Sequence, residues 1–425
     1  MAAALSLSAP AGALGRQPLE PIDLPPSIEQ GVDMIYIDPE LAPRDGPQGE
    51  MVFDAGFDNV EGPPIDFLAP ANTIYTDLRR GLVRYRMRWG SLPAIAIPAG
   101  PALKLGTTGD RVAMLRTRLG LPAGETFDAA LDKVVREYQD VHGLTSDGIA
   151  GSGTIESLNL GPEHYERILM INLERARRLP IGDKQERYAL VDAGSAKLYL
   201  YDHGRMIDSM RVIVGAEATA TPMMAAYIRY ADVNPYWNVP PELISHMVAP
   251  NVLRDGLQYL TDRDYEIFSD WTDEATPVDP KTVDWQALAD GKKTDLRFRR
   301  GPGPWNSMGK VKFMLPNDFG IYLHDYPDKK KFEAADRWIS NGCVRLEDAD
   351  RFAKFLFGYV PEGENPKVEE KVSLPKPVPV YMTYLTAEAT PSGGVKFRTD
   401  HYHRDAALLE RYSDGPDRIA SAAGG

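Results

Sequence analysis

The residues best suited to chemistry lie in one short segment around the only cysteine of this 425-residue chain. Cys343 stands in the run 340–345, Ser-Asn-Gly-Cys-Val-Arg, and His324 lies nineteen positions upstream. A lone cysteine forms no intramolecular disulfide and supplies no multi-thiolate zinc site, so it is either an inert buried thiol or a reactive one. A flanking glycine and a nearby arginine favour an exposed, electropositive thiolate over a packed core. With the histidine as base, the segment holds the pair that nucleophilic acyl transfer requires.

The segments around these residues indicate how they are positioned. The run 321–324, Ile-Tyr-Leu-His, predicts a strand that delivers His324 at its end. Gly342 allows a tight turn, so the amides of Gly342 and Cys343 could face a developing oxyanion. Arg345 keeps its charge and could hold a carboxylate or stabilise a thiolate. The run 347–350, Glu-Asp-Ala-Asp, predicts the start of a helix, where acidic residues suit the positive helix end.

This block resembles the active site of the L,D-transpeptidases, the YkuD catalytic domain family, whose signature is an upstream histidine and a Ser-x-Gly-Cys-x-Arg block. Many family members carry histidine before the glycine, whereas this chain has Asn341, so His324 is the only histidine of the motif available as a base. The resemblance covers roughly residues 75 to 405. The further segments that resemble the larger periplasmic subgroup are 234–241, 301–303 with Asn306, 309–313, 323–325 and 379–381.

The resemblance implies a role for each site residue. It implies Cys343 as the nucleophile, His324 as the general base, the amides of Gly342 and Cys343 as the oxyanion hole, and Arg345 as the group that holds the loop or a substrate carboxylate. Candidates for substrate contact are Asn341, Ser340 and Tyr322, with Trp237 in the pocket wall.

The implied reaction transfers an acyl group between two peptidoglycan stem peptides. The thiolate attacks the carbonyl after the L-centre of diaminopimelate in a tetrapeptide stem and expels D-Ala. The amine of a neighbouring stem then resolves the acyl-enzyme and gives a 3→3 cross-link. No cofactor or metal is required, and the pair His401-x-His403 is not interpreted as a metal site.

Two other readings stay open at this point. The same acyl-enzyme could pass to water, as in an L,D-carboxypeptidase, or to a lysine of an envelope protein attached to the wall. A non-enzymatic alternative is a catalytically degenerate wall-binding scaffold, and the intact Cys343, His324 and Arg345 argue against it.

Length and composition predict a globular chain of more than one domain, and the resemblance implies a multidomain α+β protein that works on the cell wall. Hydrophobic content of 43% and charged content of 26% describe a globular chain. The net charge of −13 argues against nucleic-acid binding, which needs a basic face. No apolar run approaches the roughly 18 residues that a membrane span needs. The Ala- and Ser-rich run 1–15 fits the remnant of an export signal, which together with the resemblance predicts a periplasmic location in an envelope of the Gram-negative type.

Composition and periodicity divide the chain into successive units. A mostly β catalytic domain follows a small three-helix module, which resembles peptidoglycan-binding modules and could bind wall or act only as scaffold. An aromatic, helical insertion at about 240–295 interrupts the catalytic domain. It is either a packed excursion, with Trp271 and Trp285 in its own core, or a lid that covers the site with side chains such as Trp271 or Tyr259. The predicted units are an extended Pro-rich arm (1–70), a scaffold helix (71–100), the module (101–160), a linker helix (161–184), the catalytic domain (185–405) and a tail (406–425).

Overall fold

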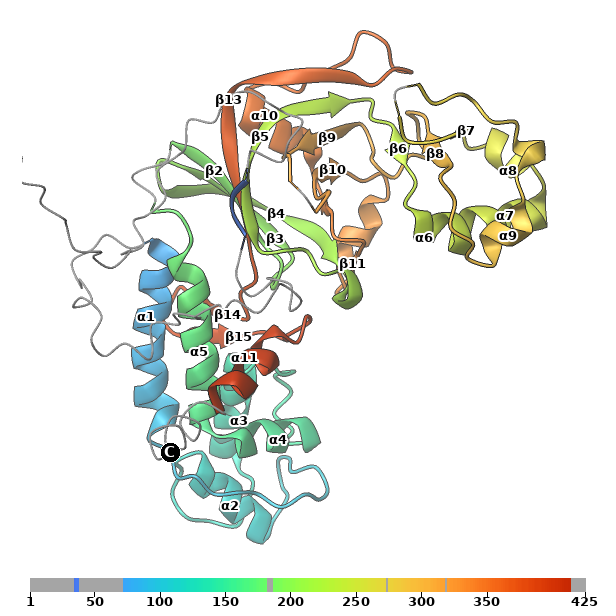
Figure 1. Ribbon diagram of the computed structural model, residues 1–425. Helices are drawn as coiled ribbons and strands as arrows, with labels where there is room; N and C mark the ends of the chain where they lie inside the picture. Colours follow the sequence, from blue (N-terminus) through green and yellow to red (C-terminus); the bar gives the residue numbers. More distant parts are fainter. Residues whose placement is uncertain (1–33, 38–71, 182–185, 273, 318, 414–425) are drawn as a thin grey trace, which may run out of the picture.

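The computed structural model describes residues 34–37, 72–181, 186–272, 274–317 and 319–413, and the expected arm and tail fall largely outside these ranges. Three bodies follow one another in space: a helical body, a central sheet and a side lobe (Figure 1). The α+β class with a mostly β catalytic region is confirmed. Within the expected arm, the described strand β1 (Met34–Ile37) pairs with the sheet strand β5 (Met224–Val233).

The central sheet closes on itself. Its strand order is β1-β5-β13-β2-β3-β4-β12-β10-β9, and β9 pairs back with β5. The remaining strand, β11, pairs with β4. Their bounds are β2 Arg187–Asp192, β3 Lys197–Asp202, β4 Arg205–Gly215, β9 Val311–Met314, β10 Leu323–Asp325, β11 Trp338–Ser340, β12 Val344–Leu346 and β13 Glu370–Thr383.

Helix α10 (Ala349–Phe357) packs on the apolar side of this sheet and anchors the strands that carry the site. The Asp348 side chain caps it by accepting a 2.9 Å hydrogen bond from the Arg351 amide, as the acidic run predicts. The ring of Phe352 meets Phe313 of β9 edge to face at 4.9 Å. The short strands next to the site therefore rest on a rigid apolar layer.

The helical body contains the three helices expected between residues 101 and 160. They are α2 (Asp110–Arg118), α3 (Ala129–Val141) and α4 (Ser152–Leu160). Around them lie α1 (Thr73–Tyr85), the π-helical turn η2 (Arg86–Gly90) and α5 (Pro162–Arg177), and all share one apolar core. The module is therefore built into a larger helical unit.

The chain returns to this helical body after the central sheet. Strands β14 (Ala387–Ala389) and β15 (Val395–Phe397) contribute to the helical core, although the sequence predicted 394–397 as part of the catalytic sheet. Helix α11 (Arg404–Ser413) packs on α5, so most of 406–413 is helix rather than tail. Asn172 of α5 accepts hydrogen bonds from the amides of Thr386 (2.8 Å) and Ala387 (3.2 Å). The buried pair Arg175–Asp405, at 2.6 Å, adds a second link.

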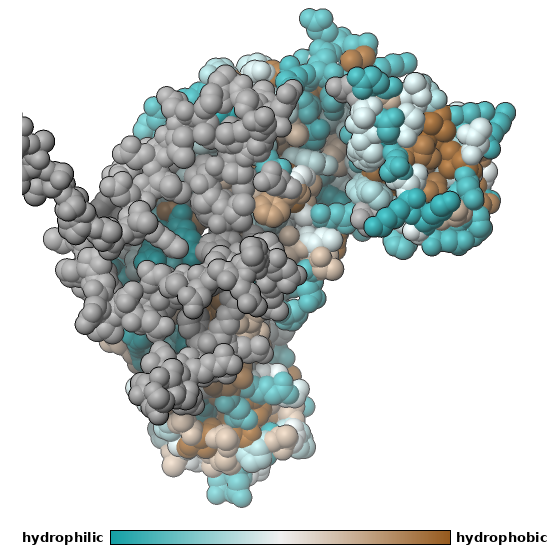
Figure 2. All heavy atoms as spheres, viewed as in Figure 1, coloured by the Kyte–Doolittle hydropathy of each residue, from teal (hydrophilic) through white to brown (hydrophobic). Residues whose placement is uncertain are grey.

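The insertion forms a lobe, defined here as Trp237–Met308, with its own apolar core and its own three-stranded sheet. Figure 2 shows a hydrophobic patch on the lobe among hydrophilic side chains. Trp285 packs against the lobe core and Tyr259 belongs to it, whereas Trp271 is 50% exposed. The elements are β6 Trp237–Asn238, α6 Pro241–Leu243, η4 Ile244–Val248, α7 Ala249–Asp255, α8 Gln258–Thr261, β7 Tyr265–Phe268, η5 Pro280–Thr282, α9 Trp285–Ala289 and β8 Arg297–Arg300.

Candidate active site

Strand pairing brings the motif residues to one face of the sheet. Strands β10 and β12 run parallel, with His324 opposite Arg345. Successive side chains of a strand point to opposite faces. Leu323 is fully buried in the sheet core, so His324 and Arg345 point to the other face. Tyr322 and Cys343 lie two positions before them and share that face.

Gly342 gives the cysteine loop its shape. Its φ of +110° lies in a region that L side chains rarely adopt. A Cβ at this position would also lie 3.0 Å from Cδ1 of Ile321. The tight turn expected from the sequence is therefore present, and it requires glycine.

Ser340 organises the loop from inside. Its hydroxyl accepts a 3.2 Å hydrogen bond from the Gly342 amide and donates one of 2.7 Å to the Cys343 carbonyl. Ser340 is buried, so its position is that of a loop anchor more than of a substrate contact. Because the Gly342 amide is engaged by Ser340, an oxyanion would be stabilised by the Cys343 amide or would displace the serine hydroxyl.

A second segment, residues 215–221, holds the same loop from outside. The Thr221 hydroxyl donates a 2.7 Å hydrogen bond to the Gly342 carbonyl and accepts one of 2.9 Å from the Gly215 amide. Thr219 donates to the Ser340 carbonyl at 2.8 Å. Sequence reasoning missed both threonines, because the contacts span 121 positions and leave no local signal.

The Cys343 thiol is partly buried and protonated. Its Sγ donates to the Gly320 carbonyl at 3.6 Å. Burial raises the pKa of the thiol, while hydrogen bonding to Tyr322 and the charges of Arg345 and Lys312 oppose that rise. The exposed thiolate expected from the sequence is therefore not the resting form, and the nucleophile needs a base at the moment of attack.

His324 is buried and neutral. Burial lowers its pKa to about 3, and the charges of Arg345 and Lys312 lower it further while Asp325 opposes them. Its Nδ1–H donates to the Asp325 carbonyl at 2.5 Å. This bond fixes the tautomer and leaves Nε2 as a proton acceptor, the form that a general base requires.

Cys343 and His324 are diagonal neighbours on adjacent strands. With strands about 4.8 Å apart and a rise of about 3.3 Å per residue, their Cα atoms lie about 8 Å apart. Side chains of this size can meet across that distance. Among the hydrogen bonds between described residues none joins the thiol to the imidazole, so their direct contact stays a prediction.

A row of charged residues crosses the strands beside His324. Lys312 of β9 lies opposite His324, and Asp232 of β5 lies opposite Lys312. The Lys312 ammonium pairs with Asp232 at 3.1 Å and lies 4.0 Å from Glu369. With Arg345 on the other side, His324 stands between two cations. Sequence reasoning did not place Lys312 in the site, because its position opposite His324 depends on strand pairing.

The remaining predicted residues lie at different depths. Asn341 is exposed at the tip of the loop. The Arg345 guanidinium lies 4.4 Å from the ring centre of Tyr326. Trp237 is buried in the lobe core rather than in the cysteine loop. Tyr322 packs against both the sheet core and the lobe core, so it connects Trp237 with the site.

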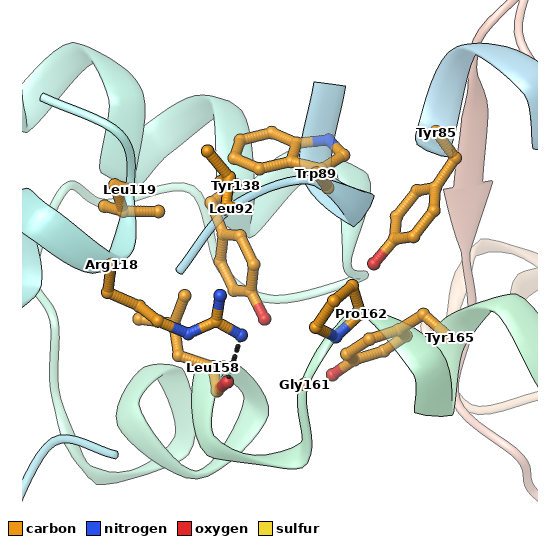
Figure 3. Close-up of a pocket in the computed structure, with 10 residues that line it drawn as sticks. All are labelled: Tyr85, Trp89, Leu92, Arg118, Leu119, Tyr138, Leu158, Gly161, Pro162 and Tyr165. Atoms are coloured by element: carbon orange, nitrogen blue, oxygen red, sulfur yellow. Dashed lines mark hydrogen bonds between the residues drawn. The ribbon is translucent and has the colours of Figure 1, made fainter. Parts of the chain in front are cut away.

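A separate small pocket lies in the helical body. Figure 3 shows Tyr85 and Trp89 from the first helical segment, Arg118 from α2, and a hydrogen bond of 2.8 Å from Arg118 to the Leu158 carbonyl. The space is about 10 Å³, room for about one water molecule. Its complete lining is Tyr85, Trp89, Leu92, Arg118, Leu119, Tyr138, Leu158, Gly161, Pro162 and Tyr165. The pocket is a packing defect between helices and not a groove for a peptide.

Comparison with known proteins assigns two domains. Residues 186–380 match the model of the L,D-transpeptidase catalytic domain (YkuD), and residues 113–158 match that of the "Putative peptidoglycan binding domain". A curated "Putative L,D-transpeptidase" of Haemophilus influenzae is 32% identical over 226 residues, which are 52% of this chain and 44% of the relative. The chain thus matches less than half the length of that relative.

Solved structures of L,D-transpeptidases are also similar at low scores. The catalytic domain from E. faecium matches with 16% identity and a TM-score of 0.23, over 47% of this chain and 98% of its own. The L,D-transpeptidase from Mycobacterium smegmatis matches with 12% identity and a TM-score of 0.23, over 46% of this chain and 58% of its own. Because these scores are low, the assignment depends on the family models and the curated relative. Residues 186–380 are thus similar to the L,D-transpeptidase catalytic domain (YkuD), and residues 113–158, which precede them, are similar to a peptidoglycan-binding domain.

Proposed function

We propose that this protein is a peptidoglycan L,D-transpeptidase that forms 3→3 cross-links through an acyl-enzyme on Cys343. The observation that carries the proposal is the common face of Tyr322, His324, Cys343 and Arg345 on the parallel pair β10–β12. A nucleophile, a neutral base and a fixed cation then share one surface. That combination suits acyl transfer from a carboxylate-bearing peptide.

The first half-reaction starts from a neutral thiol and a neutral imidazole. Nε2 of His324 takes the thiol proton as Sγ attacks the carbonyl carbon of the donor stem. The amide of Cys343 stabilises the oxyanion. The C–N bond to D-Ala breaks, the leaving amine takes the proton from His324, and a thioester remains.

The second half-reaction returns the enzyme to its starting state. The amine of a neighbouring stem attacks the thioester carbon and gives a proton to His324. The C–S bond breaks, the sulfur recovers the proton, and the new amide bond is the cross-link. A general base accelerates a reaction by about 10²–10⁴-fold and an oxyanion donor by about 10²–10³-fold. Loss of either group should therefore lower the rate severely.

The site of action follows from this substrate. We place the protein in the periplasm, with peptidoglycan stems as its partners and the helical module as a contact to the wall. In the described ranges, no helix combines the length and apolar character that a membrane crossing needs. Envelope proteins that offer a lysine remain alternative acyl acceptors.

Incubation of the protein with a disaccharide-tetrapeptide tests the proposal. Mass measurement should show a dimer that has lost one D-Ala, whereas release of D-Ala with a tripeptide product would instead indicate a carboxypeptidase. Transfer to a lysine of an added envelope protein would identify an attachment enzyme.

Replacement of the nucleophile is the control for this assay. Cys343→Ala should abolish product and abolish acylation by a carbapenem, with an unchanged thermal unfolding curve. Activity within tenfold of wild type in this variant would overturn the nucleophile assignment. Absence of any acylation in the wild-type protein would support the scaffold alternative.

A further inference from the structure

The lobe contains a buried guanidinium that has no acidic partner among the described residues. Arg300, the last residue of β8, is 7% exposed and makes no ion pair with any other described residue. Its Nη1 donates to the Trp305 carbonyl, and its Nε has no hydrogen-bond partner. Buried charges are normally paired, because removing an unpaired charge from water is strongly unfavourable. An arginine of this kind therefore calls for an explanation.

Two aromatic rings account for part of this burial. Strand pairing places Trp237 of β6 and Tyr265 of β7 on either side of Arg300. The guanidinium carbon lies 4.2 Å from the ring centre of Tyr265 and 5.3 Å from that of Trp237. Cation–π contacts of this kind offset only part of the cost of removing the charge from water. Rings of this kind also leave the edge of a guanidinium available for a planar anion.

A second arginine adds to the positive charge. Arg263 lies over the ring of Tyr259 at 4.3 Å and within 5.8 Å of Trp305, which is 61% exposed. Its charge depresses the pKa of Arg300, which burial lowers first. Asp264 acts on Arg300 in the opposite direction but is exposed and forms no ion pair with it within the described residues. Two guanidinium groups therefore stand together, and no described carboxylate forms a salt bridge with either of them.

The position of this cluster links it to the cysteine loop. Figure 1 shows β6 and β8 on the side of the lobe toward β9 and β10. Trp237, the strand neighbour of Arg300, belongs to the lobe core, and Tyr322 packs against that core and the sheet core. Tyr322 in turn shares its face with Cys343. A peptide that crosses Tyr322 from the thiol would approach the Arg300 edge of the lobe.

We propose that Arg300, assisted by Arg263, is a carboxylate-binding subsite for the peptide stem whose carbonyl reacts at Cys343. The inference deepens the proposed function and rests on it. A carboxylate supplies the missing counter-charge and can accept two parallel hydrogen bonds from one guanidinium. The lobe thereby selects donors by charge at a distance from the reacting carbonyl.

The test removes the charge from each side of the contact in turn. Donor tetrapeptides are prepared with each carboxylate either free or converted to a carboxamide, and the rate of Cys343 acylation gives kcat/KM. For wild type, one amidated position should lower kcat/KM by about 10- to 100-fold. In Arg300→Gln, kcat/KM for the free acid should fall by the same factor. This variant should also no longer distinguish the acid from the amide at that position.

The neighbouring residue on β8 supplies the matched control. Arg299 points to the opposite face and pairs with Glu266, so Arg299→Gln should discriminate acid from amide as wild type does. If Arg300→Gln fails to fold, Arg263→Gln carries the test, because the Arg263 side chain is only partly buried and forms no ion pair with another described residue. Its expected result is a smaller but measurable loss of discrimination.

Two outcomes overturn the proposal. One is full discrimination between acid and amide in a folded Arg300→Gln protein, or in Arg263→Gln where that variant replaces it. The other is wild-type acylation that is indifferent to every carboxylate of the donor. In both cases Cys343 is still acylated, so the proposed function stands. Failure of wild type to react with any donor refutes the proposed function instead.

Discussion

Replacement of Thr221 by valine should disable the cysteine loop while keeping its size. Valine has the same shape and removes the hydroxyl that joins Gly215 to the Gly342 carbonyl. Thr221 is 1% exposed, so both backbone groups lose their partner out of reach of water. Each unsatisfied buried group costs about 1–3 kcal/mol, so the two groups together predict a loss of about 2–6 kcal/mol in the free energy of unfolding.

The same change should slow chemistry beyond its effect on stability. Gly342 holds a positive φ next to the nucleophile, and a displacement of about 1 Å at a reacting group costs about 10²-fold in rate. We therefore expect single-turnover acylation of Cys343 to fall about 10- to 100-fold in Thr221→Val, measured on folded protein by mass. Thr221→Ser restores the hydroxyl and should recover most of the rate.

Thr219 provides the comparison that can refute this reasoning. Its hydroxyl also supports the loop, but the Ser340 carbonyl that it contacts accepts a second bond, of 2.9 Å, from the Ala216 amide. Thr219→Val should therefore cost no more than about 1.5 kcal/mol and change acylation less than about threefold. Equal effects of the two valine variants on both urea unfolding and acylation would show that Thr221 has no special place in the loop.

Three further predictions concern the thiol, the helical body and the lobe. The rate of alkylation of Cys343 by iodoacetamide should reach half its maximum above pH 9, because burial raises the pKa of the thiol. Lys312→Met should move that midpoint to higher pH, because it removes a cation that favours the thiolate. A midpoint near neutral pH would contradict the burial of the thiol. The free energy of unfolding should fall as the pH drops from about 6.5 toward 3, because histidines that stay neutral in the folded state bind protons in the unfolded state. The expected slope is up to about 1.4 kcal/mol per pH unit for each neutral buried histidine. Burial lowers the pKa of His142 to about 3, so His142→Gln should flatten that slope in urea titrations, and an unchanged slope would exclude it as a source. Replacing 238–307 by a short linker should raise the ratio of hydrolysed to cross-linked product if the lobe excludes water from the acyl-enzyme, whereas an unchanged ratio in a folded, active protein would mean that the lobe is no lid.

Local sequence patterns were sufficient to predict the elements that short-range interactions determine. The three helices of the module follow from apolar spacing and from turn residues, and the glycine before Cys343 does adopt a conformation that needs glycine. The strand predicted over 321–324 is present only in part: β10 covers Leu323–Asp325, so His324 lies at its centre and not at its end. The family motif predicted the site residues without any knowledge of strand order.

Long-range pairing set the features that the sequence could not reveal. Lys312 is beside His324 only because β9 pairs with β10, and Thr221 reaches Gly342 across 121 positions. Residues 395–397 alternate like a strand of the central sheet, yet they pair with β14 and bury their apolar face on helices. Alternation predicts a strand but not its neighbour, so the sequence could not assign it to a sheet.

The return of the chain to the helical body changes how the two large bodies can move. The chain leaves α5 near Arg177 for the central sheet and comes back at Thr386, and strand β1 of the same sheet precedes helix α1 of the helical body. The bodies are therefore joined at more than one point, which rules out free rotation about a single linker. Tyr402, which lies beyond the second crossing, donates a hydrogen bond of 2.8 Å to the Gly215 carbonyl beside the cysteine loop. A fragment cut at residue 380, where the family match ends, would therefore lose the hydrogen bond by which Tyr402 supports the segment next to the cysteine loop.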